Sequence, residues 1–134
     1  MIHNFDVKAK DNSITGGVPL NTTIKVQPGD LLVITASPDD TWSAGEGDRT
    51  SNANGLSNPM GGPYGLYTSG SYAFLFGSLV GTFDDGKTYF GIGTYLAMTV
   101  LTKGVLKLVY WDGFSGDNSG SVNATVQVYV GPKP

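Results

Sequence analysis

The sequence predicts an all-β fold, a small antiparallel β-sandwich formed by one domain over residues 1–134. Short runs of β-branched and aromatic residues recur along the chain, and clusters of Gly, Pro, Asn and Asp separate them. No stretch has the period of an amphipathic helix. Glycine is abundant, with 20 residues, whereas charged residues make up only 14% of the chain. A closed barrel is the alternative fold, and the lack of an internal repeat argues against a propeller or solenoid.

The first part of the chain reads as short strands joined by turns. Strands are expected at residues 5–9, 22–26 and 31–36. The third is a continuous apolar run and therefore the best core strand in this half. The tripeptide Pro28-Gly29-Asp30 is a strong turn signal and separates the second strand from the third.

Residues 38–70 have a different composition. Gly, Pro, Asn, Ser and Asp dominate, and neither a strand nor a helix period persists. A structureless stretch of this length inside a small domain is normally functional or disordered. Three aromatic residues, Trp42, Tyr64 and Tyr67, favour a packed functional loop, because disordered linkers contain few aromatics.

Strand patterns resume in the second half. Strands are expected at residues 72–76, 79–83, 88–92, 96–101, 105–111 and 120–130, with a tail at 131–134. Asp85-Gly86 predicts a hairpin turn between the second and third of these strands.

The composition excludes several classes of function. There is no cysteine and one histidine, His3, so disulfides, thiol nucleophiles and most histidine-based catalysis or metal ligation are ruled out. Eight scattered Lys and Arg residues in a chain of net charge −3 cannot form a phosphate-binding stripe, which excludes nucleic acid as a partner. No segment reaches the roughly 18 apolar residues of a membrane span. We expect a soluble protein, cytoplasmic or exported without a classical signal peptide.

The loop from Tyr110 to Gly120 is the strongest functional signal. It lies between two expected strands and contains three side chains with hard oxygen atoms, Asp112, Asp117 and Asn118. These oxygens repel one another unless a cation lies among them, and Ca²⁺ accepts about six to eight such ligands in flexible geometry. A solvated turn is the simpler alternative. The loop does not follow the EF-hand pattern, since no Glu closes it.

Catalysis is not expected. A Ser-His-Asp arrangement could use only His3, and there is no nucleophile-elbow motif. Paired carboxylates do occur, at residues 39–40, 84–85 and in the 110–120 loop, so a small carbohydrate-active hydrolase is one hypothesis to test. The simplest interpretation of the first two pairs is a turn. The sequence therefore predicts a binding protein and no enzyme.

Several motifs in a fixed order resemble one family. They are Pro-Gly-Asp at 28–30, Gly-Asp-Arg at 47–49, Asn-Gly-Leu at 54–56, Leu-Val-Tyr-Trp-Asp at 108–112 and Gly-Asp-Asn-Ser-Gly-Ser at 116–121. In this order, from about residue 5 to 130, they resemble the calcium-dependent galactose-binding bacterial lectins of the PA-IL (LecA) type. The resemblance implies a jelly-roll-like, galactose-binding-domain-like β-sandwich, one Ca²⁺ per subunit, galactose-type glycans as partners, and a homo-oligomer, either a dimer or a tetramer.

The resemblance also implies which residues form the site. The calcium ligands would be Asp112, Asp117 and Asn118, the backbone carbonyl of Trp42, and one carbonyl from residues 114–116, taken here as that of Ser115. The sugar contacts would be Trp42, Ser51, Asn54, Asp112, Gly113 and Asp117.

The chain departs from the family in ways that bear on its ligand. Ser51 stands where the family has a histidine that contacts the sugar, and the calcium loop is two residues shorter. The segment after residue 56 is longer than in the family. The prediction is a calcium-dependent lectin for a galactose-type terminal monosaccharide. The alternative is a non-catalytic, calcium-stabilised adhesion or structural module that binds a protein or a lipid headgroup, which exposed apolar residues such as Phe114, Met60 and Leu66 would favour.

Overall fold

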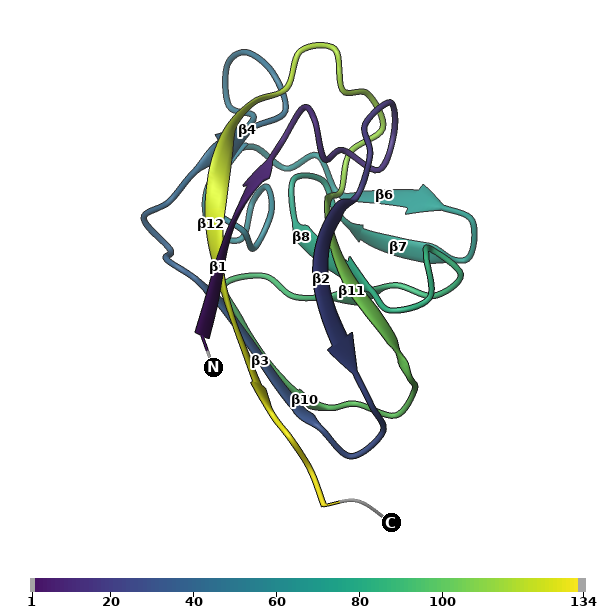
Figure 1. Ribbon diagram of the computed structural model, residues 1–134. Helices are drawn as coiled ribbons and strands as arrows, with labels where there is room; N and C mark the ends of the chain where they lie inside the picture. The colour runs from purple at the N-terminus through teal and green to yellow at the C-terminus, as the bar shows by residue number, and fades with distance from the viewer. Residues whose placement is uncertain (1, 133–134) are drawn as a thin grey trace.

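The computed structural model describes residues 2–132, which form an all-β sandwich (Figure 1). The strands are β1 (Ile2–Lys8), β2 (Leu20–Val26), β3 (Leu31–Ala36), β4 (Trp42–Ser43), β5 (Thr50–Ser51), β6 (Leu66–Ser69), β7 (Tyr72–Leu75), β8 (Leu79–Thr82), β9 (Phe90–Gly91), β10 (Tyr95–Thr99), β11 (Gly104–Tyr110) and β12 (Ser119–Tyr129). The prediction of an antiparallel β-sandwich is confirmed.

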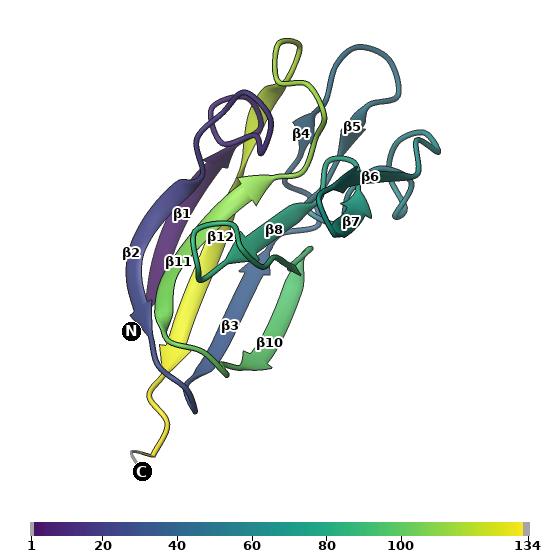
Figure 2. The ribbon, with the colours of Figure 1, turned by 90° about the vertical axis from the view of Figure 1, so that its right-hand side faces the viewer.

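Two antiparallel sheets form the layers. One contains β10, β3, β12, β4 and β5 in that order, with β1 paired to residues 121–127 of β12 along the edge opposite β3. The second contains β2, β11, β8 and β9. Figure 2 shows β12, β3 and β10 in one layer and β2, β11 and β8 in the other. A separate hairpin, β6–β7, lies at the side of the second layer.

The core between the layers follows from the alternation of apolar residues. In β3, Leu32, Ile34 and Ala36 are buried, and in β12 the buried residues include Val122 and Val126. Their partners across the core come mainly from β11, which is central in its sheet. The alternation is clear because the first sheet covers the core with one face only.

Strand β8 is buried along its whole length, which alternation alone does not explain. The β6–β7 hairpin covers the outer face of β8 and β11, where Val80, Val109 and Trp111 form a second apolar cluster. Phe74 of the hairpin contacts Trp111 edge-on at 5.0 Å between ring centroids, and the Trp111 indole N–H donates to the Tyr67 carbonyl at 2.6 Å. The hairpin thereby fixes the end of β11 that leads into the 112–118 loop.

The structure corrects several strand predictions. Residues 38–70 are not free of strands, because they contain the short strands β4 and β5 and the start of the hairpin, β6. The strand expected at 88–92 is reduced to β9, so Asp85-Gly86 is not a two-residue hairpin turn but part of a longer loop. The first strand begins at Ile2, before the expected residue 5. Of the predicted tail, residues 133–134 lie outside the described residues.

The described chain contains no helix with the length and apolar character needed to cross a membrane.

Candidate functional site

The 112–118 loop connects the two layers of the sandwich. It begins after β11 in one sheet and ends before β12 in the other. Its first and last residues, Asp112 and Asn118, are only 6% and 5% exposed, unlike the residues between them. Two strongly polar side chains are therefore buried where the sheets meet.

The hydrogen bonds of Asn118 orient its amide. Its Nδ2 donates to the carbonyl of Ala9 at 2.8 Å, and this identifies Oδ1 as the atom on the opposite side of the amide. On Asp112, Oδ1 accepts from the backbone N–H of Gly113 at 2.8 Å. The remaining oxygens, Asp112 Oδ2 and Asn118 Oδ1, are buried and have no hydrogen-bond partner among the described residues. Such acceptors are costly unless a hydrogen atom or a cation satisfies them.

The electrostatics of Asp112 agree with this geometry. Burial raises the pKa of the Asp112 carboxyl, and the nearby charge of Asp117 acts in the same direction. The Gly113 N–H and the side chain of Asn118 oppose the shift, which places Asn118 next to the carboxyl. The hydrogen bonds of the carboxylate therefore do not offset the cost of its burial.

The residues present fit a hard cation that accepts oxygen ligands of several kinds. Asp112 and Asn118 each provide an unsatisfied oxygen, and Asp117 lies close to both in the same loop. Within residues 2–132 no three His, Cys, Asp or Glu side chains gather as a metal cluster. A cation at this loop would therefore need amide and backbone carbonyl oxygens besides the carboxylates, and Ca²⁺ readily accepts such a mixed set.

A pocket of about 240 Å³ lies beside Asp112. Its walls come from position 112, the segment between β4 and β5, the long connection between β5 and β6, and the residue directly after β7. The lining residues are Ala44, Arg49, Leu56, Tyr64, Phe76 and Asp112. The unsatisfied carboxylate thus lies at the edge of a hollow that can admit a small ligand.

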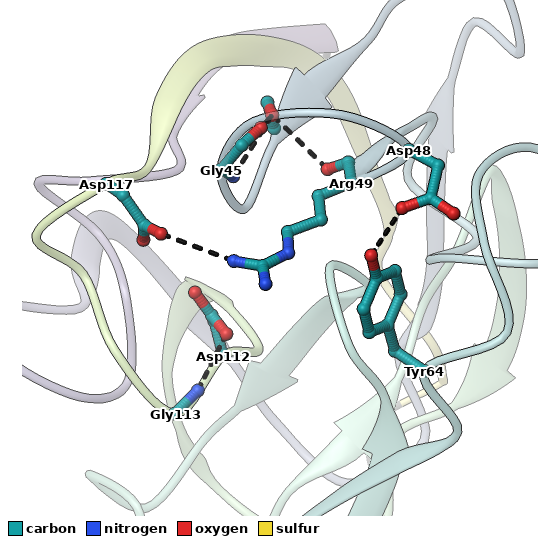
Figure 3. Close-up of polar contacts among 8 residues, drawn as sticks. Gly45, Asp48, Arg49, Tyr64, Asp112, Gly113 and Asp117 are labelled. Carbon is teal, nitrogen blue, oxygen red and sulfur yellow. Dashed lines mark hydrogen bonds and ion pairs between the residues drawn. The ribbon is translucent and has the colours of Figure 1, made fainter.

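Arg49 lies on this pocket close to the acidic loop (Figure 3). Its Nη1 is 3.5 Å from Asp117 Oδ2, and the guanidinium carbon is 5.4 Å from the centroid of the Tyr64 ring. The hydroxyl of Tyr64 donates to Asp48. Gly45 permits this approach, because its φ is +147° and a Cβ there would lie 2.8 Å from Asp117 Oδ2.

Tyr64 and the neighbouring carboxylates raise the pKa of the Arg49 guanidinium, Tyr64 having the largest effect. In the sequence, Arg49 stands out only as part of the Gly-Asp-Arg motif and was not predicted as a site residue. The position of the Gly-Asp-Arg motif in the irregular 38–70 segment was the sequence signal that could have identified Arg49 as a site residue.

The structure brings some of the predicted site residues together. Asp112, Asp117, Asn118, Gly113 and Ser115 share the loop, and the Ser115 carbonyl accepts from the Asn118 N–H at 3.1 Å. Trp42 lies in β4 and pairs with Gly120, two residues after the end of the loop. The Trp42 side chain itself is buried in the core, with its indole N–H on the Gly77 carbonyl at 2.9 Å. Its backbone, and not its ring, is therefore the part close to the loop.

Two predicted sugar contacts are placed elsewhere. Ser51 is fully buried, and its hydroxyl donates to the Asn52 carbonyl at 2.9 Å. Asn54 Oδ1 accepts from the backbone N–H of Thr94 at 2.8 Å, and Asn54 lines a different hollow beside Phe74. Neither residue lines the pocket at Asp112.

Comparisons with known proteins bear on the fold. No family model matches the chain, and no curated protein matches it significantly. Among solved structures it is similar to one described as "EclA N-terminal domain; PllA-like lectin", with a TM-score of 0.67 and 20% sequence identity. The match covers 94% of this chain and 95% of that one. The chain has the fold of that lectin domain. At this identity the likeness establishes the architecture, and the ligand must be argued from the site.

Proposed function

We propose that the protein is a non-enzymatic lectin that binds a galactose-type terminal monosaccharide through Ca²⁺. The ligands would be Asp112, Asp117 and Asn118, with the backbone carbonyls of Trp42 and Ser115. The observation that carries this proposal is the pair of buried, unsatisfied oxygens, Asp112 Oδ2 and Asn118 Oδ1, together with the pocket that Asp112 lines. The similarity to a lectin domain, as a likeness of fold, supports it.

The residues around the loop suit a small sugar. Bound Ca²⁺ would offer coordination positions that two vicinal hydroxyls fill in place of water. Leu56, Tyr64 and Phe76 provide an apolar wall for the carbon-bearing face of a sugar ring. The hydrogen bond from Asn118 Nδ2 to Ala9 and the packing of the hairpin on Trp111 hold the loop in place before a ligand arrives. A single sugar makes few contacts, so we expect modest affinity, increased by a dimer or tetramer that engages several glycans at once.

Calorimetric titration of methyl galactoside with Ca²⁺ and after chelation tests the proposal. Heat that appears only with Ca²⁺ supports it, and equal heat in both conditions removes the metal from it. The Asp112→Asn variant should lose the calcium-dependent heat. Asp11→Asn is the matched control, since the Asp11 side chain is 69% exposed and pairs only loosely with Lys8 at 3.9 Å. Loss of binding in both variants would contradict the assignment of Asp112.

A second candidate is a calcium-stabilised adhesion or structural module. Phe114, at the tip of the acidic loop, is 65% exposed, and Leu66 is 60% exposed, whereas Met60 is half-buried. An apolar side chain beside a cation site is also a way to reach a lipid headgroup. Co-sedimentation with vesicles that contain phosphatidylserine, in Ca²⁺ and with Phe114→Ala as comparison, separates the two candidates. Calcium-dependent sedimentation that Phe114→Ala abolishes, without a sugar response, would favour the second.

A further inference from the structure

Few polar side chains line the pocket beside Asp112. Four of its six lining side chains are apolar or aromatic, and only Arg49 and Asp112 carry charge. The proposed function assigns Asp112 to the cation, and the Tyr64 hydroxyl donates to Asp48. Arg49 is therefore the side chain of this set with N–H donors to offer a ligand.

Two polar side chains that the resemblance assigns to a neutral sugar, Ser51 and Asn54, do not line this pocket. The Ser51 hydroxyl is buried on a backbone carbonyl, and the Asn54 carbonyl oxygen accepts from Thr94. A binding site selects a neutral sugar through buried donors and acceptors matched to its hydroxyls. With these two side chains elsewhere, the pocket is poorly equipped to select such a sugar beyond the hydroxyls at the cation.

The ring of Tyr64 positions the guanidinium of Arg49 at the pocket. The guanidinium lies over the Tyr64 ring, and Tyr64 is in turn fixed by its hydroxyl on Asp48. The Asp48 carbonyl accepts from the Gly62 N–H at 2.7 Å, which ties the two loops together. Figure 3 shows the guanidinium in the space bordered by Asp117, Asp112 and Tyr64.

Arg49 has donors to spare. A guanidinium carries about five N–H groups in a planar fork, and the contact with Asp117 is long, at 3.5 Å, between side chains that are 44% and 43% exposed. A cation that takes the Asp117 carboxylate competes with this contact. The loaded site would then present a guanidinium with a weakened internal partner to the pocket.

We infer that Arg49 makes the calcium-loaded site select an acidic sugar, a hexuronic acid of the galacto configuration, over its neutral counterpart. Such a ring keeps the vicinal hydroxyls for the cation, and its carboxylate matches the planar fork of the guanidinium. The apolar wall of Leu56, Tyr64 and Phe76 accommodates the ring itself. This inference rests on the proposed function.

The test compares two ligands, methyl galactoside and the methyl glycoside of galacturonic acid, by calorimetry at fixed Ca²⁺ with blank titrations for binding of the uronate to free Ca²⁺. The proteins are the wild type, Arg49→Gln, Arg49→Lys and Lys8→Gln. Lys8 is the matched control for loss of one positive charge, because its side chain is 60% exposed and lies on a different hollow. Circular dichroism and thermal unfolding confirm that each variant is folded.

A charge-assisted pair at a partly exposed site should give the uronate about a tenfold preference in the wild type and in Lys8→Gln. Arg49→Gln should bring the two affinities within about twofold, and Arg49→Lys should restore part of the preference, since it keeps the charge but loses the fork. Equal affinities in the wild type, or a preference that Arg49→Gln leaves unchanged, would overturn the inference while leaving calcium-dependent sugar binding intact. Absence of heat with both sugars would overturn the proposed function and the inference together.

Discussion

Two acidic loops of this protein begin with similar residues and have opposite environments. Asp84 follows β8, and both of its carboxylate oxygens are satisfied within the loop by Thr82 Oγ1 at 2.9 Å, the Thr88 N–H at 2.8 Å and Thr88 Oγ1 at 2.6 Å. Asp112 follows β11 and leaves Oδ2 buried without a partner among the described residues. The first loop satisfies both oxygens of its aspartate, and the second satisfies only one.

The pKa shifts express the same contrast. Burial tends to raise the pKa of the Asp84 carboxyl, but the hydrogen bonds from Thr88 and Thr82 outweigh it, and the pKa is lowered. Burial of Asp112 is not outweighed, and the pKa of that carboxyl is raised. An acidic loop is therefore a candidate cation site when it has fewer hydrogen-bond donors than its carboxylate oxygens need. Its content of Asp and Gly alone does not identify such a site.

The largest expected effect concerns cation affinity at the two loops. Asp112→Asn should weaken Ca²⁺ binding by about a hundredfold or more, because it removes a charged ligand from a site with few carboxylates. Asp84→Asn should leave the affinity unchanged. Terbium luminescence titration, with competition by Ca²⁺, measures both. Similar losses in both variants would mean that the two loops do not differ as proposed.

Stability in the presence of Ca²⁺ sharpens the comparison. At a free Ca²⁺ concentration a hundred times the dissociation constant, the wild type and Asp84→Asn should each gain about 2.7 kcal/mol, which raises the melting temperature by roughly 10 °C. Asp112→Asn should gain little. Calorimetric melting with Ca²⁺ and after chelation gives these values, and a melting temperature of the wild type that chelation does not change would count against a cation at the 112–118 loop.

Without Ca²⁺ the two loops should respond in opposite directions to the same substitution. Asp112→Asn removes a buried charge whose Oδ2 has no hydrogen-bond partner among the described residues, so we expect stabilisation by about 1 kcal/mol. Asp84→Asn replaces an acceptor of three hydrogen bonds and should destabilise by about 1 kcal/mol. Urea unfolding with a chelator present measures both. Destabilisation by Asp112→Asn would show that its carboxylate has a partner after all.

The smallest effect is the pH dependence at Asp84. The pKa of its carboxyl is lower in the folded protein than in the unfolded chain, so its stabilising contribution is present above the unfolded pKa and is lost as the pH falls through the folded pKa. The difference in unfolding free energy between the wild type and Asp84→Asn should therefore be constant near neutral pH and shrink as the solution is acidified below about pH 4. A difference that grows with acidification would contradict this sign.

The sequence predicted the strands that their own residue pattern identifies, a continuous apolar run at 31–36 and an alternation of apolar residues at 120–130. The runs at 31–36 and 120–130 form β3 and β12 almost as expected, because each buries one face against the core. Strands β4 and β5 were missed, since two residues carry no period and these strands exist only through pairing with β12 and with each other. Residues 83–89 form one long loop because Asp84 folds the chain around itself, which a dipeptide turn signal does not reveal.

The candidate site was predictable only in its local part. Asp112, Asp117 and Asn118 lie within seven residues, so the acidic loop was visible in the sequence. The hydrogen bond that orients Asn118 is accepted by the carbonyl of Ala9, which is 109 residues away in the chain. The contact between Arg49 and Asp117 spans 68 residues. Such contacts depend on how the sheets pack, and no local pattern encodes them.

The register of β1 on β12 shows at which end of the first sheet the acidic loop lies. Lys8 pairs with Ser121, next to the acidic loop, whereas Ile2 pairs with Gln127 toward the opposite end of the sheet. The N-terminal start of β1 and the C-terminal end of β12 both point away from the 112–118 loop (Figure 1). A tag or tether fused at either end would therefore attach the molecule at the end opposite the 112–118 loop. Attached to a biosensor chip in this way, it would present Asp112 and Arg49 to the solution.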